Sequence, residues 1–160
     1  MNESAHLPSR IRPAIPFAVI AIVSIVLGGA VSAASAPTAN YTASWAVAYL
    51  VLVAGVAQLA LGVAQALLTP EAPSSRMITA EVVIFNLANV AVLLGTLADQ
   101  TVVVDLGGVL MIVALVLFLV TVRGARTTNR WLLYGFRFVV AVLVVTTPIG
   151  LIISAIRGQA

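Results

Sequence analysis

The sequence of 160 residues contains no cysteine, no lysine and a single histidine, His6. Without cysteine there can be no disulfide, thiolate metal site or thiol nucleophile. Without lysine no Schiff base can form, which excludes retinal proteins of the rhodopsin type. One histidine cannot provide the paired axial ligands of a membrane haem b, and none lies in an apolar segment to serve a nucleophilic serine. We therefore expect no cofactor, no metal ion and no catalytic residue.

Charged residues are also scarce. They make up 8% of the chain, whereas 62% is hydrophobic. A soluble domain carries about 25% charged residues. The net charge is +3, and all eight basic residues are arginine. With so few charges, this arginine excess is typical of the cytoplasmic segments of a membrane protein and does not indicate nucleic-acid binding. The Ala/Val/Leu-rich composition is typical of a bacterial protein, and we expect it in the plasma membrane, in contact with the lipid bilayer.

Five apolar segments follow one another along the chain, at residues 14–34, 43–68, 77–97, 102–122 and 131–156. Each is near or above the length of about 20 residues that a helix needs to cross the hydrocarbon core. None alternates in the manner of a β-barrel strand. The sequence predicts an all-α integral membrane protein, with a five-helix membrane domain over 14–156 between an arm (1–13) and a short tail (157–160). The four residues 98–101 predict a tight hairpin between the third and fourth segments.

The positions of the arginines predict the orientation. With a cytoplasmic N-terminus, the arm, the loop 69–76 and the basic loop 123–130 all lie inside, and only Arg157 lies outside. Basic residues favour the cytoplasmic side of a membrane. We therefore expect the N-terminus inside and the C-terminus outside.

The first segment also imitates a secretory signal. It has a basic start, an apolar stretch and the small-residue triplet at 34–36. The apolar stretch is longer than the 7–15 residues of a signal core, and Pro37 would directly follow the cut. Both features favour an uncleaved helix. Cleavage after Ala36 would leave four spans.

Amide side chains recur inside the second and third segments. The second contains the repeat GVAQ at 55–58 and 62–65, whose spacing of seven puts both copies on one stripe. At 1.5 Å per residue, Gln58 lies at the same depth as Asn86 in the third segment. Asn89 is three residues further on and shares that face. We predict an amide cluster of these three residues, either as a contact between helices or as a polar path for a solute.

Two opposite charges also lie at matching depth, Glu81 in the third segment and Arg137 in the fifth. We predict that they form an ion pair. Alternatively, each side chain reaches the head groups separately, or Glu81 serves as the protonatable carboxylate of a coupled transporter. An adjacent arginine would favour the ionised form and argues against the last use. The candidate intramembrane polar residues are Gln58, Gln65, Glu81, Asn86, Asn89 and Arg137.

Small residues form two stripes that suit close contact between helices. Ser24, Gly28 and Ser32 lie on the first segment, and Gly55 and Gly62 on the second. Either stripe could pack against another helix of the chain, a membrane-protein partner or a second copy.

The absence of a catalytic set makes an enzyme an unfavoured interpretation. The first functional hypothesis is an interaction protein, either an accessory subunit of a larger membrane complex or a homo-oligomer. The alternative is a small transporter or channel, whose polar path runs around Gln58, Asn86, Asn89 and Glu81.

Overall fold

The structure is a computed structural model that describes residues 11–38, 40–69, 72–123 and 130–157, with the side chains of the last helix described from Trp131 to Thr147. Within these residues every regular element is helical. The first ten residues of the predicted arm, loop residues 124–129 and tail residues 158–160 lie outside the described part. The elements are η1 (Arg12–Ala14), α2 (Ile15–Ser35), η2 (Ala36–Thr38), α3 (Tyr41–Tyr49), η3 (Leu50–Ala57), α4 (Gln58–Leu68), α5 (Ser75–Leu97), α6 (Thr101–Val122) and α7 (Arg130–Arg157).

Four helical stretches are long and apolar enough to cross a membrane. They correspond to the first four predicted segments and are bounded as Arg12–Thr38, Tyr41–Leu68, Ser75–Leu97 and Thr101–Val122. Helix α7 covers the fifth segment, and its apolar part with described side chains is the shorter stretch Trp131–Thr147. The chain is thus a helical protein with membrane-like apolar helices, while the count of five spans stays a prediction.

The helix ends follow from local residue choices. Asn40 accepts a hydrogen bond from the backbone N–H of Ala43 at 2.8 Å and so caps α3. Between α5 and α6, Asp99 adopts a left-handed backbone with a φ of 52°. The N–H of Gln100 donates to the carbonyl of Gly95 at 2.8 Å, which is the Schellman ending of a helix. This turn confirms the predicted hairpin.

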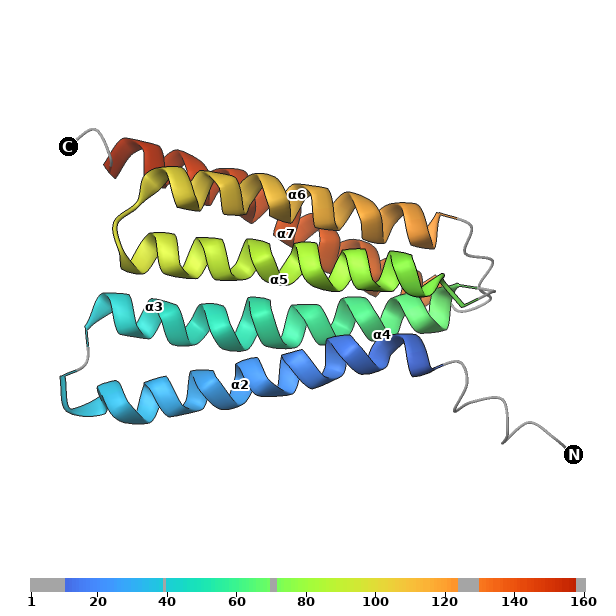
Figure 1. The fold of residues 1–160 in the computed structure, drawn as a ribbon, viewed down its shortest axis with the longest axis horizontal. Coiled ribbons are helices and arrows are strands. Elements are labelled where there is room, and N and C mark those ends of the chain that lie inside the picture. The colour runs from blue at the N-terminus through green and yellow to red at the C-terminus, as the bar shows by residue number, and fades with distance from the viewer. Residues whose placement is uncertain (1–10, 39, 70–71, 124–129, 158–160) are drawn as a thin grey trace, which may run out of the picture.

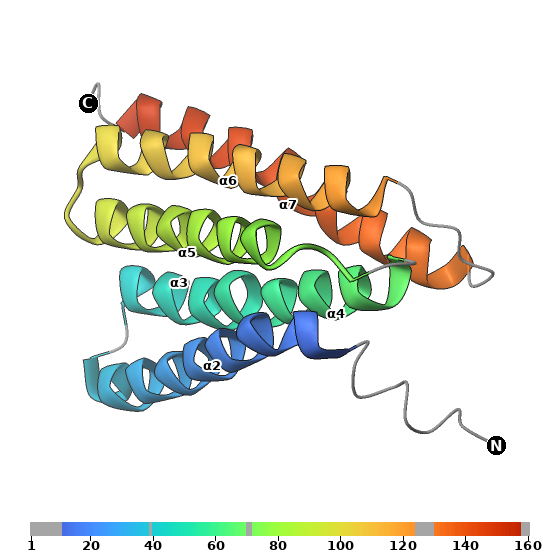
Figure 2. The same cartoon turned by 45° about the vertical axis from the view of Figure 1, so that its right-hand side comes forward.

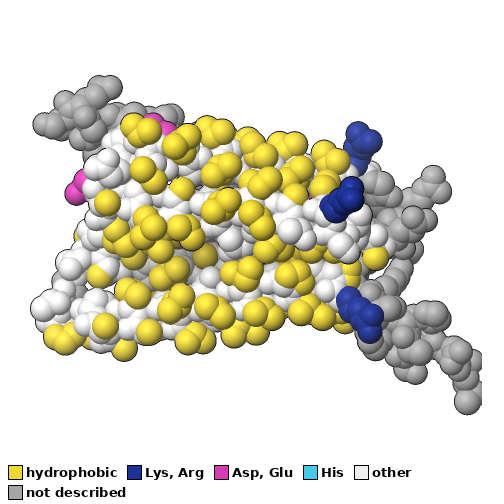
Figure 3. Space-filling view, viewed as in Figure 1, with side chains coloured by type: hydrophobic (Ala, Val, Ile, Leu, Met, Phe, Trp, Pro, Cys, Tyr) yellow, Lys and Arg dark blue, Asp and Glu magenta, His cyan; other side chains and the backbone are white. Residues whose placement is uncertain are grey.

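The helices run up and down in sequence (Figure 1). Helices α2, α3–α4, α5 and α6 lie side by side, and α7 packs against α4 and α6. Figure 2 shows the same order from a turned view. Arginine side chains gather at the end where α2 begins, acidic side chains lie at the opposite end, and hydrophobic side chains cover the surface between them (Figure 3). An apolar belt between two polar ends is the surface that a bilayer requires.

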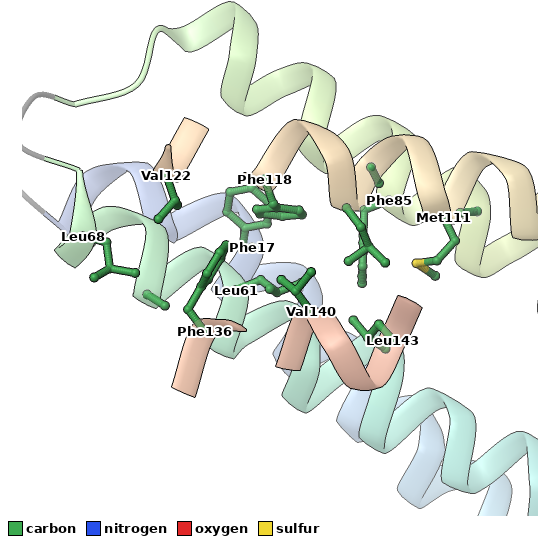
Figure 4. Packing of buried hydrophobic residues seen from close by; sticks show 14 residues of the cluster. Phe17, Leu61, Leu68, Phe85, Met111, Phe118, Val122, Phe136, Val140 and Leu143 are labelled. Atoms are coloured by element: carbon green, nitrogen blue, oxygen red, sulfur yellow. The ribbon is translucent and has the colours of Figure 1, made fainter. Parts of the chain in front are cut away.

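Three phenylalanines form the centre of the core. Phe17 of α2 lies 5.4 Å from Phe118 of α6 between ring centroids, and Phe85 of α5 meets Phe118 edge to face at 6.1 Å. All three are fully buried. Figure 4 shows Leu61 and the α7 residue Phe136 next to them. Phe118 therefore joins three helices.

Glycines bring α2 close to the second helical stretch. A Cβ atom added at Gly28 would lie 2.7 Å from Val51, and one at Gly55 only 2.5 Å from Ile25. At Gly62 it would lie 2.6 Å from the Cβ atom of Phe17. The two small-residue stripes thus face each other inside the chain.

This internal contact is one of the alternatives that the sequence left open for the stripes, packing against another helix of the same chain. Ser24, Gly28, Gly55 and Gly62 are all buried by the chain's own helices, and only Ser32 is exposed. Close approach of two helices within one chain satisfies the same requirement for small residues as contact between chains.

A π-helical turn, η3, separates α3 from α4. The sequence pattern predicts one uninterrupted stripe and gives no sign of this element. π-turns widen a helix locally and are frequent at functional sites. Gln58 is the first residue after it, and the side chains of Gln58 and Gln65 both remain buried.

Candidate functional site

Buried polar side chains define the candidate site. Among the described residues they are Ser24, Gln58, Gln65, Thr69, Glu81 and Asn89. The hydrocarbon core of a bilayer supplies no hydrogen-bond partner, so each group depends on the protein interior. The hydrogen-bond partners that each group has or lacks therefore indicate which polar atoms of the interior remain free to bind a ligand.

Glu81 is the centre of this set. Its side chain is 0% exposed. One carboxylate oxygen, Oε2, accepts a hydrogen bond from Nε2 of Gln65 on α4 at 2.7 Å. The other, Oε1, accepts from the hydroxyl of Thr121 on α6 at 2.6 Å. The carboxylate thus connects α4, α5 and α6 through two uncharged donors, and we call these three residues the Glu81 cluster.

The rotation of α5 explains why Glu81 points inward. Glu81, Phe85 and Ala88 are buried at helical spacings of four and three residues. Asn86 lies about 140° round the helix from Glu81, is half-buried, and donates to the carbonyl of Val82 on its own helix at 2.8 Å. The predicted amide cluster of Gln58, Asn86 and Asn89 is therefore not formed, because Asn86 faces away from the core.

Rotation also separates Glu81 from Arg137. On α7 the core face is formed by Phe136, Val140 and Leu143, whereas Arg137 is exposed. In the described part of the chain both oxygens of Glu81 have neutral partners, and no ion pair joins it to Arg137. The prediction of this pair used depth and sign of charge alone, and neither specifies the direction in which a side chain points.

Asn89 has a different partner from the predicted one. The hydroxyl of Tyr49 donates to Oδ1 of Asn89 at 2.9 Å, and Nδ2 of Asn89 donates to the carbonyl of Phe85 at 2.9 Å. The ring of Trp45 stacks on Tyr49 with centroids 5.2 Å apart. Tyr41 is 73% exposed, as an interfacial residue should be, but the hydroxyl of Tyr49 turns into the protein.

Removing this hydroxyl tests the contact between α3 and α5. Tyr49→Phe is expected to lower the free energy of unfolding in mixed micelles by about 0.6–2 kcal/mol, the range for hydrogen bonds between membrane helices. Tyr41→Phe is the matched control, because Tyr41 is exposed at the start of the same helix. Equal effects of the two substitutions would contradict the contact.

Gln58 is buried without a hydrogen-bond partner for either amide atom. The Oε1 atom of Gln65 is likewise buried and unpartnered. An unpaired buried amide costs roughly 2–7 kcal/mol, depending on the reference solvent. Gln58 lies seven residues from Gln65, about 10.5 Å along the helix axis. The interior therefore has unused hydrogen-bonding capacity at two levels of the same helix.

Sequence reasoning missed Thr121 and Tyr49. Thr121 is the single polar side chain in the run 109–122, close to the end of α6. That end lies beside the start of α5, because the two helices form an antiparallel hairpin. A single hydroxyl at the same depth as the Glu81 carboxylate was the sequence feature that could have predicted this contact. Tyr49 gave no such signal, because its place in an aromatic group equally fits an interface.

The chemistry of the site is that of hydrogen-bond acceptors. Within the described residues no group of three or more His, Cys, Asp or Glu side chains is placed to hold a metal ion. The Glu81 cluster has acceptor oxygens on the carboxylate, the Gln65 amide and the Thr121 hydroxyl, and its two donor groups are the Gln65 amide nitrogen and the Thr121 hydroxyl.

No protein-family model, no curated protein and no solved structure matches the chain.

Proposed function

We propose that this chain is a small transporter or channel of the cell membrane, which moves a small polar solute or ion through the interior of its helical bundle. In this proposal it has five spans with a cytoplasmic N-terminus, and it acts by binding and release without covalent catalysis. The observation that carries the proposal is Gln58, which is 0% exposed and has both amide atoms unpartnered.

Buried polar groups at successive depths support this function. Counted from the end of the bundle where α4 ends and α5 begins, the Glu81 cluster lies nearest that end, Gln58 lies deeper, and the Tyr49–Asn89 pair lies beyond it. Glu81 and Asn89 are eight residues apart on α5, about 12 Å at the helical rise. Polar side chains inside a membrane protein are costly and commonly line a solute or ion pathway. A solute bound at Gln58 would supply the missing hydrogen bonds.

The other candidate is an interaction protein, either an accessory subunit or a homo-oligomer. The small-residue stripes, as a contact with another chain, were one of the features that favoured it. Gly28, Gly55 and Gly62 instead pack inside this chain. The exposed hydrophobic side chains, such as Phe138 of α7, suit contact with lipid as well as with a protein.

Accessibility of position 58 to water tests the proposal. The chain has no cysteine, so a single Gln58→Cys variant in liposomes has one reactive site. We expect a charged, membrane-impermeant thiol reagent to modify it at least about tenfold faster than a cysteine facing lipid, because the reactive thiolate forms in water. The modified fraction is measured over time by mass spectrometry.

Two single-cysteine variants serve as controls. Val56→Cys lies two residues away on the exposed apolar surface and is expected to stay unmodified. Asn40→Cys lies at the exposed start of α3, and is expected to react from the outer side if the N-terminus is cytoplasmic. If Gln58→Cys reacts as slowly as Val56→Cys, the interior is dry and the transport function is wrong.

A further inference from the structure

We propose that the Glu81 cluster is a proton-binding site, in which the Glu81 carboxylate takes up and releases one proton. This inference rests on the proposed transport function, for which it supplies the coupling ion. Proton uptake forms one O–H bond on a carboxylate oxygen, and release returns that proton to water without any other bond being made or broken.

The uncharged surroundings of Glu81 among the described residues favour proton binding. The elements that contact its carboxylate present Gln65 from α4 and Thr121 from α6, which are both neutral. The arginines with described side chains at this end are all exposed; they are Arg12, Arg76, Arg123 and Arg137. A buried carboxylate with no counter-charge is strongly disfavoured in a low-dielectric interior unless it is neutralised. A bound proton neutralises it.

The hydrogen-bonding groups of the cluster suit both forms of Glu81. The ionised form accepts from the Gln65 amide and the Thr121 hydroxyl, as observed. The protonated form needs an acceptor, and Thr121 Oγ1 is already 2.6 Å from Oε1. The unpartnered Oε1 of Gln65 belongs to the amide that contacts Glu81, so rotation of that amide offers a second acceptor. Neither form requires a backbone movement.

The short distances in the cluster favour a proton over a metal ion. A bound cation such as Ca²⁺ requires about six to eight oxygen ligands at 2.3–2.6 Å. Here the side chains contact each other directly at 2.6 and 2.7 Å, with one carboxylate among them. A metal ion would have to separate these contacts, whereas a proton needs no additional volume.

Infrared difference spectroscopy of the full-length protein in liposomes tests the site. We expect the wild-type protein to show a C=O stretching band of a protonated carboxylic acid, which disappears reversibly as the pH is raised. Glu81→Gln should abolish the band while the helical content and thermal stability are retained, because glutamine has the size of the acid and its amide can contact the same groups. Asp105→Asn is the matched control, and should leave the band unchanged because Asp105 lies at the opposite end of the bundle.

Two substitutions at Thr121 separate proton binding from a purely structural role. Thr121→Val removes the hydrogen bond to Oε1 and should shift the frequency of the band, whereas Thr121→Ser should preserve it. Absence of a titrating band in the wild-type protein, or its survival in Glu81→Gln, would overturn the proposal.

The spectroscopic test is independent of the cysteine test. A titrating Glu81 band together with an unreactive Gln58→Cys would retain the proton site and reject the transport function. A reactive Gln58→Cys without the band would retain a wet pathway and reject the proton site.

Discussion

Replacing Phe118 by alanine is expected to lower the free energy of unfolding by about 3–5 kcal/mol, the usual cost of deleting a fully buried aromatic ring. Phe118 contacts Phe17 at 5.4 Å and Phe85 at 6.1 Å, and so joins α2, α5 and α6. Lipid tails are as apolar as the protein core, so membrane helices associate mainly through such close packing. The loss of one ring would leave a cavity shared by three helices.

The adjacent residue is the matched control for Phe118. Leu119 lies on the same helix but is 42% exposed. Leu119→Ala is expected to change stability by less than about 1 kcal/mol, because surface positions away from special contacts contribute little. Both variants are compared by equilibrium unfolding in mixed micelles. Similar losses for the two would mean that the aromatic cluster is not the centre of packing.

Gly107→Ala is expected to destabilise the hairpin of α5 and α6 by about 1–3 kcal/mol, the usual cost of overpacking. The added Cβ atom would lie 2.8 Å from the backbone nitrogen of Val92 and 3.1 Å from the carbonyl oxygen of Ala88. Gly95 approaches α6 equally closely, because its Cβ position lies 2.8 Å from the nitrogen of Val104. Backbone atoms cannot rotate away, so the two helices must separate.

The expected loss of stability in Gly107→Ala is opposite to the change that the intrinsic helix preference for alanine over glycine predicts. In an ordinary helix interior alanine is favoured over glycine by about 1 kcal/mol. Gly29→Ala on α2 should show this gain, because nothing lies within 4 Å of its Cβ position. If Gly107→Ala were as stable as Gly29→Ala, the close approach of α5 and α6 would be disproved.

The sequence by itself determined the helices and their polar ends. Apolar length specifies where a helix can cross hydrocarbon, and this property is local to each segment. The same holds for the turn at Asp99, because four residues leave no room for a longer connection. The identity of Glu81, Gln65 and Asn89 as interior polar groups was likewise available from residue type within an apolar run. Residue type therefore predicted four of the six candidates correctly as buried polar groups, whereas Asn86 is half-buried and Arg137 is exposed.

The tertiary structure alone decided which polar groups meet. Depth along a helix follows from residue number, but the partner of Glu81 depends on the rotation of four helices about their axes, and an error of one residue turns a side chain by about 100°. For this reason Glu81 contacts Thr121 and Gln65 and leaves Arg137 at the surface. The contacts of the glycine stripes also could not be predicted from the sequence. Small residues predict close approach, but only the packed bundle decides that Gly62 meets Phe17 of its own chain.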